Sequence, residues 1–254
     1  MSSPKGIARP LTLGRRLVND LLRYARRVPS LPLSRRCSIV KLCQARAQAA
    51  QPVSWMALFM KAYGLAGERY PELRRAYIPY PRVRIYEHPR SDCAILVERD
   101  VGGEICVLAA KIHEPERTPL ATIDEHLRRF RNDELRAISP FRQLLRLGRL
   151  PRILRSFVFW STLYFSGYKR AKRFGTFMMS SLGNLGVEQI HPLTPLTTYF
   201  TFGPIGSDGT VNLKIIYDHR VMDGRLVGRV LVDLENILNH ELADELTQLS
   251  RQAA

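Results

Sequence analysis

The sequence predicts an α/β protein, and three observations carry this prediction. Segments with apolar residues at three- and four-residue spacing, which is typical of helices, alternate with short apolar segments of the kind that form strands. Turns rich in Gly and Asp separate several of these segments. The chain has 254 residues, 45% of them hydrophobic, which is enough to bury the core of one large domain.

The first part of the chain contains two predicted helices. Residues 13–28 place their leucines on one face and their arginines mostly elsewhere, and Pro29 ends the helix. Ser54 has the character of an N-cap for a second helix. Residues 55–63 of that helix are apolar nearly all round, so we expect it to be buried.

Three strands and a helix are predicted in the middle of the chain. The strands are expected at 83–87, 94–98 and 104–112. The second and third form a hairpin because the turn 100–103 joins them. Helical spacing then resumes at 123–132.

The last part of the chain contains a second predicted hairpin and a helix. A strand at 197–202 is joined through the turn 206–209 to an alternating strand at 211–217. A helix follows at 226–238, with its leucines and valines on one stripe.

A cluster of charged residues begins where the strand 211–217 stops. His219 is followed after three residues by Asp223 and then by Gly224. A histidine ring is largely neutral near pH 7, so a ring held at a strand end can act as a general base. The spacing predicts a turn that brings Asp223 back towards its own backbone, with Gly224 in a conformation that other residues resist. The alternative is a solvated ion-pair turn made by Asp218, Arg220 and Asp223.

Two stretches carry a family resemblance. Asp218 to Gly224 resembles the active-site motif of the catalytic domain of dihydrolipoyl acyltransferases, the core subunits of 2-oxo acid dehydrogenase complexes, and more distantly that of chloramphenicol acetyltransferase. Gly175 to Gly183 resembles the family's Gly-Thr-Phe-Thr-x-Ser segment, and its serine falls on Ser180. The two motifs occur in the family's order.

The resemblance extends, with decreasing clarity, from about residue 11 to about residue 239, except at 135–173. Residues 33–42 are the counterpart of a family strand, although their alternation is poor. We therefore expect a flexible N-terminus at 1–10, a catalytic domain at 11–245 and a C-terminal tail at 246–254.

The resemblance implies a two-layer sandwich of the chloramphenicol acetyltransferase type, in which helices flank a mixed sheet. It also implies a homotrimer, or a larger assembly of trimers, with active sites between subunits. The implied catalytic residues are His219 as general base, Asp223 as the residue that holds the His219 loop through an arginine, and Ser180 as hydrogen-bond donor to the oxyanion. Ser181 is the alternative donor.

The implied reaction is transfer of an acyl group from a coenzyme A thioester or an acyl carrier protein to a thiol, hydroxyl or amine. The 254 residues have no room for the family's lipoyl and subunit-binding domains and contain no Asp-Lys-Ala lipoylation site. We therefore expect a free-standing enzyme without a bound lipoyl group. The alternatives are a core subunit served by a lipoyl domain of another chain and a non-catalytic relative, against which the retained His219 and Asp223 argue.

Composition adds expectations about location and metals. The first residues are polar rather than the start of a secretory signal. The four cysteines lack the spacing of a zinc site, so we expect reduced thiols, no metal and a cytoplasmic location.

The net charge of +16 is concentrated in one part of the chain. Residues 128–173 hold thirteen basic and two acidic side chains, a net of +11. The segment 135–173 is also rich in large apolar residues, but Arg155 interrupts it and it is too short to span a bilayer. Its three interpretations are a core helix with a solvated basic stretch, a pocket wall for a long acyl chain beside arginines that attract coenzyme A, and a peripheral contact with an anionic membrane. Nucleic acid is not expected because no binding motif accompanies the charge.

Overall fold

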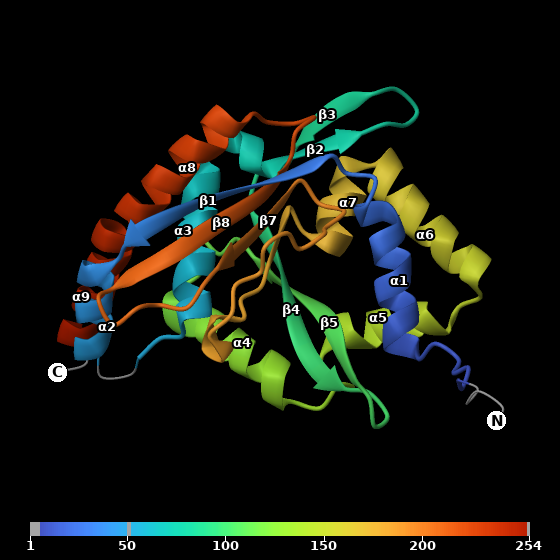
Figure 1. Ribbon diagram of the computed structural model, residues 1–254, viewed down its shortest axis with the longest axis horizontal. Coiled ribbons are helices and arrows are strands. Elements are labelled where there is room, and N and C mark those ends of the chain that lie inside the picture. Colours follow the sequence, from blue (N-terminus) through green and yellow to red (C-terminus); the bar gives the residue numbers. More distant parts are fainter. Residues whose placement is uncertain (1–5, 50–51, 253–254) are drawn as a thin grey trace, which may run out of the picture.

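The structure is a computed structural model that describes residues 6–49 and 52–252. At its centre lies a sheet of six strands, which are β1 (Ser30–Ser38), β4 (Asp92–Asp100), β5 (Ile105–His113), β6 (Phe177–Met179), β7 (Thr198–Phe202) and β8 (Thr210–Asp218). Their order is β1-β8-β7-β6-β4-β5 (Figure 1). Strand β6 runs parallel to both β4 and β7, and the other neighbours are antiparallel. The mixed sheet implied by the family resemblance is thus confirmed.

The helices divide into two groups. Those that pack on the sheet's main core face, or beside it, are α2 (Val40–Gln48), α3 (Trp55–Arg69), α4 (Leu120–Asn132), α8 (Gly224–Ile237) and α9 (Ala243–Gln252). Those that gather on the β5 side of the molecule, away from α8 and α9, are α1 (Leu13–Ala25), α5 (Ser139–Arg149), α6 (Arg152–Phe165) and α7 (Gly167–Phe174), of which α5 contacts β5 and α7 contacts β4 (Figure 1). A separate ribbon consists of β2 (Arg75–Ile78) and β3 (Arg84–Glu87).

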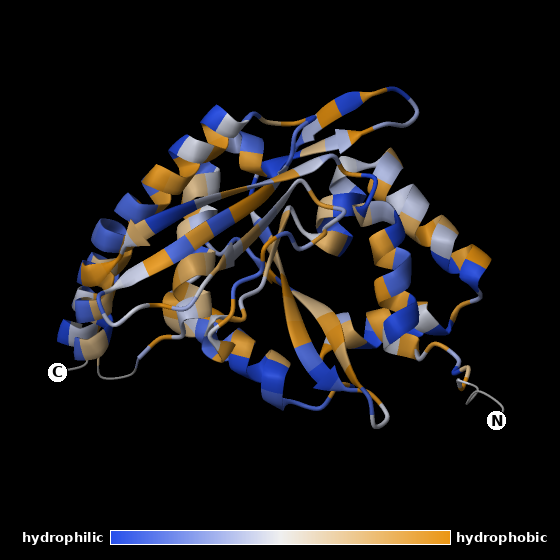
Figure 2. Ribbon diagram, viewed as in Figure 1, coloured by the Kyte–Doolittle hydropathy of each residue, from blue (hydrophilic) through white to orange (hydrophobic). Residues whose placement is uncertain are grey.

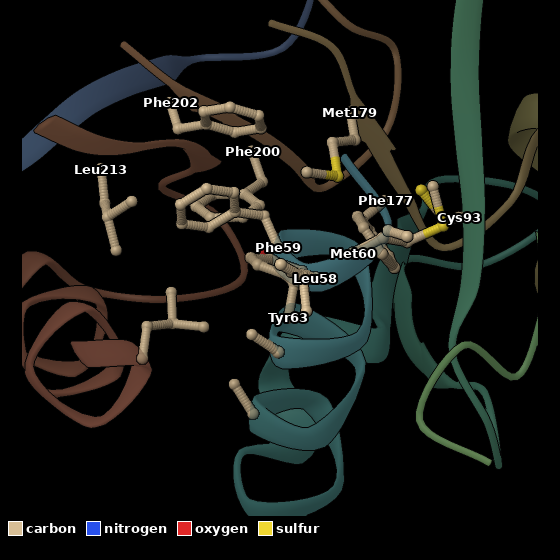
Figure 3. Close-up of a cluster of buried hydrophobic side chains, with 14 of the residues drawn as sticks. Leu58, Phe59, Met60, Tyr63, Cys93, Phe177, Met179, Phe200, Phe202 and Leu213 are labelled. Carbon is tan, nitrogen blue, oxygen red and sulfur yellow. The ribbon is translucent and has the colours of Figure 1, made fainter. Parts of the chain in front are cut away.

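The main core lies between the sheet and α3. Ser54 caps α3 as predicted, since its side chain accepts a hydrogen bond from the backbone N–H of Ala57. The ring of Phe59 stacks on that of Phe202, with centroids 4.1 Å apart, and Tyr63 lies 4.4 Å from Phe177 (Figure 3). Helix α3 also contacts α4 and α8 on its sides, which explains why its sequence is apolar nearly all round.

The other face of the sheet carries a small apolar cluster around Met178, Tyr199 and Ile216, and Phe174 of α7 packs against it. The irregular segment 180–196 crosses this face. The side chain of Lys214 donates to the carbonyl of Gln189 at 2.8 Å, which holds the segment against β8. The main helical layer and the mixed sheet together form the predicted two-layer sandwich.

The sequence was misread at 33–42. Strand β1 ends at Ser38, and Val40 begins α2. Residues from Val40 onward form a helix rather than a strand because Leu42 and Ala45, at helical spacing, both face the core, with exposures of 0% and 8%. The alternation in β1 is poor because it is an edge strand, in which only Cys37 is buried.

The predicted strand at 83–87 is confirmed as β3, which pairs with β2, a strand that the sequence reading missed. One further prediction needs correction. Residues 246–252 were predicted as a tail, yet they belong to α9, because Leu246 is buried in the main core. The first five residues of the predicted flexible N-terminus lie outside the described part of the chain, as do the last two residues of the predicted tail. All four cysteines are free, as predicted.

The segment 135–173 forms α5, α6 and most of α7. One face of α6 is a genuine core face, because Phe159 stacks on Tyr24 of α1 with centroids 5.9 Å apart. Arg155 is 5% exposed and is paired with Asp20, which is 2% exposed. Arg155 and Phe159 are therefore not available to coenzyme A or to an acyl chain. Among residues 6–49 and 52–252, no helix is long and apolar enough to cross a membrane.

We expect Asp20→Asn to destabilise the fold, because it leaves the buried guanidinium of Arg155 without its counter-charge. Breaking a buried pair in this way costs about 3–5 kcal/mol. The measurement is urea unfolding at a fixed protein concentration. The double variant Asp20→Leu/Arg155→Met, which removes both charges, should be more stable than Asp20→Asn. Equal stability of Asp20→Asn and the unchanged protein would show that the pair does not hold α1 to α6.

Candidate active site

The last residue of β8 anchors the predicted site. Asp218 is fully buried, and its backbone N–H donates to the carbonyl of Thr197 on the neighbouring strand at 2.8 Å. Its carboxylate accepts hydrogen bonds from the Arg220 side chain, with Oδ1 2.9 Å from Nε and Oδ2 2.7 Å from Nη2. Oδ1 also accepts the backbone N–H of Arg220 at 3.0 Å. This two-pronged pair fixes the chain on both sides of His219.

A second arginine approaches the same place from α7. Arg170 is 5% exposed and donates to the carbonyl oxygens of Tyr77 and Pro195, at 3.0 and 2.8 Å. Burial lowers the pKa of Arg170 to about 10, and the nearby Asp218 carboxylate opposes this shift. The guanidinium of Arg220 lies 4.2 Å from the ring centre of Tyr77, so β2 completes the site.

His219 lies at the exposed rim of this buried network. Its backbone N–H donates to the carbonyl of Pro29 at 3.1 Å, and its side chain is 47% exposed. Nδ1 lies 3.5 Å from Oδ1 of Asp223, whose side chain is 85% exposed. The ring is therefore accessible to another molecule, and Asp223 is the carboxylate nearest to it among the described ion pairs.

Two expectations about the loop were wrong. Asp223 begins α8 as its N-cap residue, but its side chain makes no capping hydrogen bond, and the loop arginine pairs with Asp218 instead. Gly224 does not have a positive φ. Space is what favours glycine there, since a Cβ would lie 3.1 Å from the hydroxyl of Tyr217.

Ser180 follows β6 and is 8% exposed. Its hydroxyl donates to Oε1 of Gln189 at 2.8 Å and lies 2.6 Å from the hydroxyl of Tyr199. Ser181, the alternative, donates to the carbonyl of Phe202 at 2.8 Å and accepts the backbone N–H of Gly183 at 3.1 Å. Because Ser181 is committed to backbone partners, Ser180 is the better placed of the two for chemistry.

The structure does not bring His219 and Ser180 together within one chain. Asp218 lies beside Thr197, whereas Ser180 follows Met179, which pairs with Phe200. About four residues of β7 thus separate the position of the His219 loop along the sheet from that of Ser180. At ~3.3 Å per residue this is about 13 Å. A base and an oxyanion donor must both lie about 3 Å from one reacting group. One chain alone does not supply such a site.

Several residues of the site were missed by sequence reasoning. Arg170 lies in the segment without family resemblance, and Gln189 lies in an irregular loop, so neither had a local signal. Tyr199 did have a local signal, because it lies in the predicted strand at 197–202. Alternation along β7 places it on the same face of the sheet as Thr201. Asp218 and Arg220 were noticed, but as a solvated turn, whereas Asp218 is fully buried.

The possible metal ligands and the thiols were also located in the structure. In the part of the chain that the structure describes, no three His, Cys, Asp or Glu side chains gather as a metal site would require. Burial raises the pKa of the Cys93 thiol well above its usual value, which disfavours a reactive thiolate.

Comparison with known proteins identifies the fold. No protein-family model matches the sequence, and no curated protein does either. Among solved structures, the dihydrolipoamide acetyltransferase of Azotobacter vinelandii superposes with a TM-score of 0.65 at 17% identity, covering 94% of this chain and 93% of that one. In that enzyme a serine, a histidine and an asparagine have a role in the catalytic mechanism.

Two other solved structures agree. The truncated catalytic core of the 2-oxoacid dehydrogenase multienzyme complex of Thermoplasma acidophilum gives a TM-score of 0.64 at 16% identity, over 93% of this chain and 99% of that one. A chloramphenicol acetyltransferase gives 0.53 at 15% identity, over 88% and 94%. The chain therefore has the fold that the two motifs implied.

We expect the two carboxylates of the loop to differ in their effect on stability. Asp218→Asn leaves the Arg220 guanidinium without its counter-charge and should cost about 2–3 kcal/mol, less than a fully buried pair because Arg220 keeps some contact with solvent. Asp223→Asn is the matched control and should cost less than about 1 kcal/mol, since its partner contact is exposed. Chemical denaturation checks both. Equal losses would mean that Asp218 does not anchor the loop.

Proposed function

We propose that this protein is an acyltransferase that moves an acyl group from a thioester to a thiol, hydroxyl or amine. The observation that carries the proposal is the placement of His219, an accessible imidazole on a loop that a buried ion pair holds at the end of β8. In the Azotobacter vinelandii acetyltransferase the asparagine follows the histidine at the spacing that separates Asp223 from His219 here. The shared fold and this shared spacing support acyl transfer rather than a purely structural role.

His219 acts as the general base in this proposal. It takes the proton from the acceptor's S–H, O–H or N–H while the acceptor atom attacks the thioester carbonyl carbon. The carbonyl electron pair moves onto oxygen and gives a tetrahedral oxyanion. When this collapses, the carbon–sulfur bond breaks, and the departing thiolate takes the proton from the imidazolium. Asp223, whose Oδ1 lies 3.5 Å from Nδ1, is close enough to orient the ring.

Ser180 is proposed to stabilise the oxyanion, but from a neighbouring subunit. The separation along β7 prevents His219 and Ser180 of one chain from meeting at one carbonyl. The homotrimer implied by the family resemblance places the two on different chains, and the core of a multienzyme complex is among the structures with this fold. The Ser180 hydroxyl would turn its hydrogen from Gln189 to the oxyanion.

The donor is proposed to be a coenzyme A thioester. The sequence contains no Asp-Lys-Ala lipoylation site, and the exposed His219 is accessible to a separate donor molecule. Exposed arginines of α5, among them Arg142 and Arg146, offer charge complementary to the phosphates of coenzyme A. A free-standing enzyme in the cytoplasm remains the interpretation that we favour. Dihydrolipoamide belongs in every acceptor series, because acylation of it alone would favour the alternative of a core subunit served by another chain.

We expect His219→Ala to lower kcat by about 10²–10⁴-fold, which is the usual contribution of a positioned base. The side chain is half-exposed, so the fold and the oligomer should persist. The measurement is mass spectrometry of products formed from a panel of acyl-CoA donors and thiol, hydroxyl and amine acceptors. A folded His219→Ala protein that transfers at the unchanged rate would remove His219 from the mechanism.

Mixing two inactive variants tests whether the site is shared between subunits. Ser180→Ala should lose about 10²–10³-fold in rate, as when one oxyanion donor is removed. When His219→Ala and Ser180→Ala chains are refolded together, random assembly gives about a quarter of the sites both wild-type residues. Activity should therefore rise to about a quarter of the unchanged protein's, far above either variant alone.

The control is Ser180→Ala mixed with the double variant Ser180→Ala/His219→Ala, which contains no wild-type serine and should stay inactive. Native mass spectrometry verifies that mixed oligomers have formed. Mixed oligomers without recovered activity would contradict a shared site, whereas acyl transfer by the unchanged protein would still support the proposed reaction.

A further inference from the structure

Helix α6 has a second, outward-facing apolar surface that the core does not use. Ile153, Leu154 and Phe157 are 83%, 53% and 61% exposed. Their spacing continues to Trp160, and a chain of ring contacts then leads to Phe165 and Tyr80. The centroid distances are 6.1 Å for Phe157–Trp160, 4.7 Å for Trp160–Phe165 and 5.6 Å for Tyr80–Phe165. We call these six residues the α6 patch.

Helix α6, which carries most of the α6 patch, lies at the edge of the molecule opposite α8 and α9 (Figures 1 and 2). The opposite face of α6 is fixed by the buried pair of Arg155 and Asp20 and by the hydroxyl of Tyr24, which donates to the carbonyl of Ser156 at 2.8 Å. A docked helix of 14 residues therefore presents bulky apolar side chains to the surroundings instead of turning them inward.

Cationic residues surround the α6 patch. The segment 139–174 contains nine lysines and arginines and no carboxylate. Arg23 donates to the Ser156 hydroxyl at 3.2 Å, and Arg84 donates to the carbonyl of Phe165 at 2.7 Å, so α1 and the β2–β3 ribbon add to the charge. The basic rim consists of Arg23, Arg27, Arg84, Arg149, Arg152 and Lys169. Among the described residues, none of these six takes part in an ion pair, whereas many arginines elsewhere do.

We propose that the α6 patch and its basic rim dock this protein on the surface of an anionic lipid bilayer. Apolar side chains beside snorkelling arginines are what an interfacial helix presents to lipid, and Trp and Tyr suit the boundary between headgroups and acyl chains. The anionic headgroups neutralise the rim while the acyl region takes up Ile153, Leu154 and Phe157. This proposal does not depend on the proposed enzymatic activity.

Charge and exposure argue against two other occupants of this surface, a second copy of the chain and an acyl chain. In an isologous contact, where the patch would meet the same patch of a second copy, two identical cationic rims would face and repel each other. An acyl chain needs enclosure, which Ile153 at 83% exposure does not provide. Because nothing in the described residues spans a bilayer, the contact is peripheral.

The experiment is flotation of the full chain with vesicles of phosphatidylcholine, alone or mixed with phosphatidylglycerol. The unchanged protein should bind the mixed vesicles and release them as salt rises, because screening weakens the electrostatic part. The variant Ile153→Ser/Phe157→Ser should bind about tenfold more weakly or worse, since two apolar side chains no longer enter the lipid. The matched control is Ile105→Ser/Val232→Ser, which changes exposed apolar residues elsewhere and should bind normally.

Charge is tested separately. Arg149→Gln/Arg152→Gln should weaken binding to the mixed vesicles by about fivefold per arginine. Arg229→Gln/Arg251→Gln removes the same charge from exposed positions on α8 and α9 and should change binding much less. In a Trp55→Phe protein Trp160 is the single tryptophan, and its emission should shift to the blue when mixed vesicles are added.

Three outcomes would overturn the proposal. Equal binding by Ile153→Ser/Phe157→Ser and the unchanged protein would remove the α6 patch from any lipid contact. Equal binding to both kinds of vesicle would remove the basic rim. A Trp160 shift that follows protein concentration without vesicles, together with a smaller oligomer for Ile153→Ser/Phe157→Ser, would identify the patch as a subunit interface.

Discussion

The site depends on one buried ion pair. Asp218 is the last residue of β8, and a carboxylate without solvent is stable only when hydrogen-bond donors surround it. Arg220 supplies them two residues later, and the charge of Arg170 approaches from α7. Because the intervening residue is His219, the pair that satisfies the buried carboxylate also decides where the imidazole stands. The sheet, the β2 ribbon and α7 meet at this point, so the local order of the loop is a property of the whole fold.

Most helices and strands, and their order along the chain, could be predicted because caps, turns and apolar spacing mark them in the sequence. Ser54 caps α3, the turn at 100–103 joins β4 to β5, and the alternation of β8 ends where the charged residues begin. The failures have physical causes. Strand β1 is exposed on most of its length, so it lacks alternation, and α2 is short and places only Leu42 and Ala45 in the core. Strand β2 has four residues and is defined by its partner rather than by its own pattern.

The residues of the candidate site could be predicted, but their pairing partners and their positions relative to one another could not. The spacing of His219 and Asp223 is a sequence property, and both lie at the loop as expected. The sequence does not show which aspartate pairs with Arg220. Burial decides this, because Asp218 is fully buried whereas the side chain of Asp223 is 85% exposed. Nor does sequence show that Ser180 stands some four residues along β7 from His219. That separation follows from the short parallel strand β6, which ends at the level of Phe200.

The segment 135–173 shows how one stretch of sequence can serve two environments. Its composition is compatible with a core helix and with an interfacial helix, because periodicity shows that apolar residues recur and not what covers them. In the structure both faces of α6 are apolar, and they differ in their charge partners. The inner face neutralises Arg155 with Asp20 inside the protein. Among the described residues, the arginines around the outer face have no carboxylate partner, so they remain free to meet an anionic surface. The same helix therefore packs on α1 with one face and is proposed to bind lipid with the other.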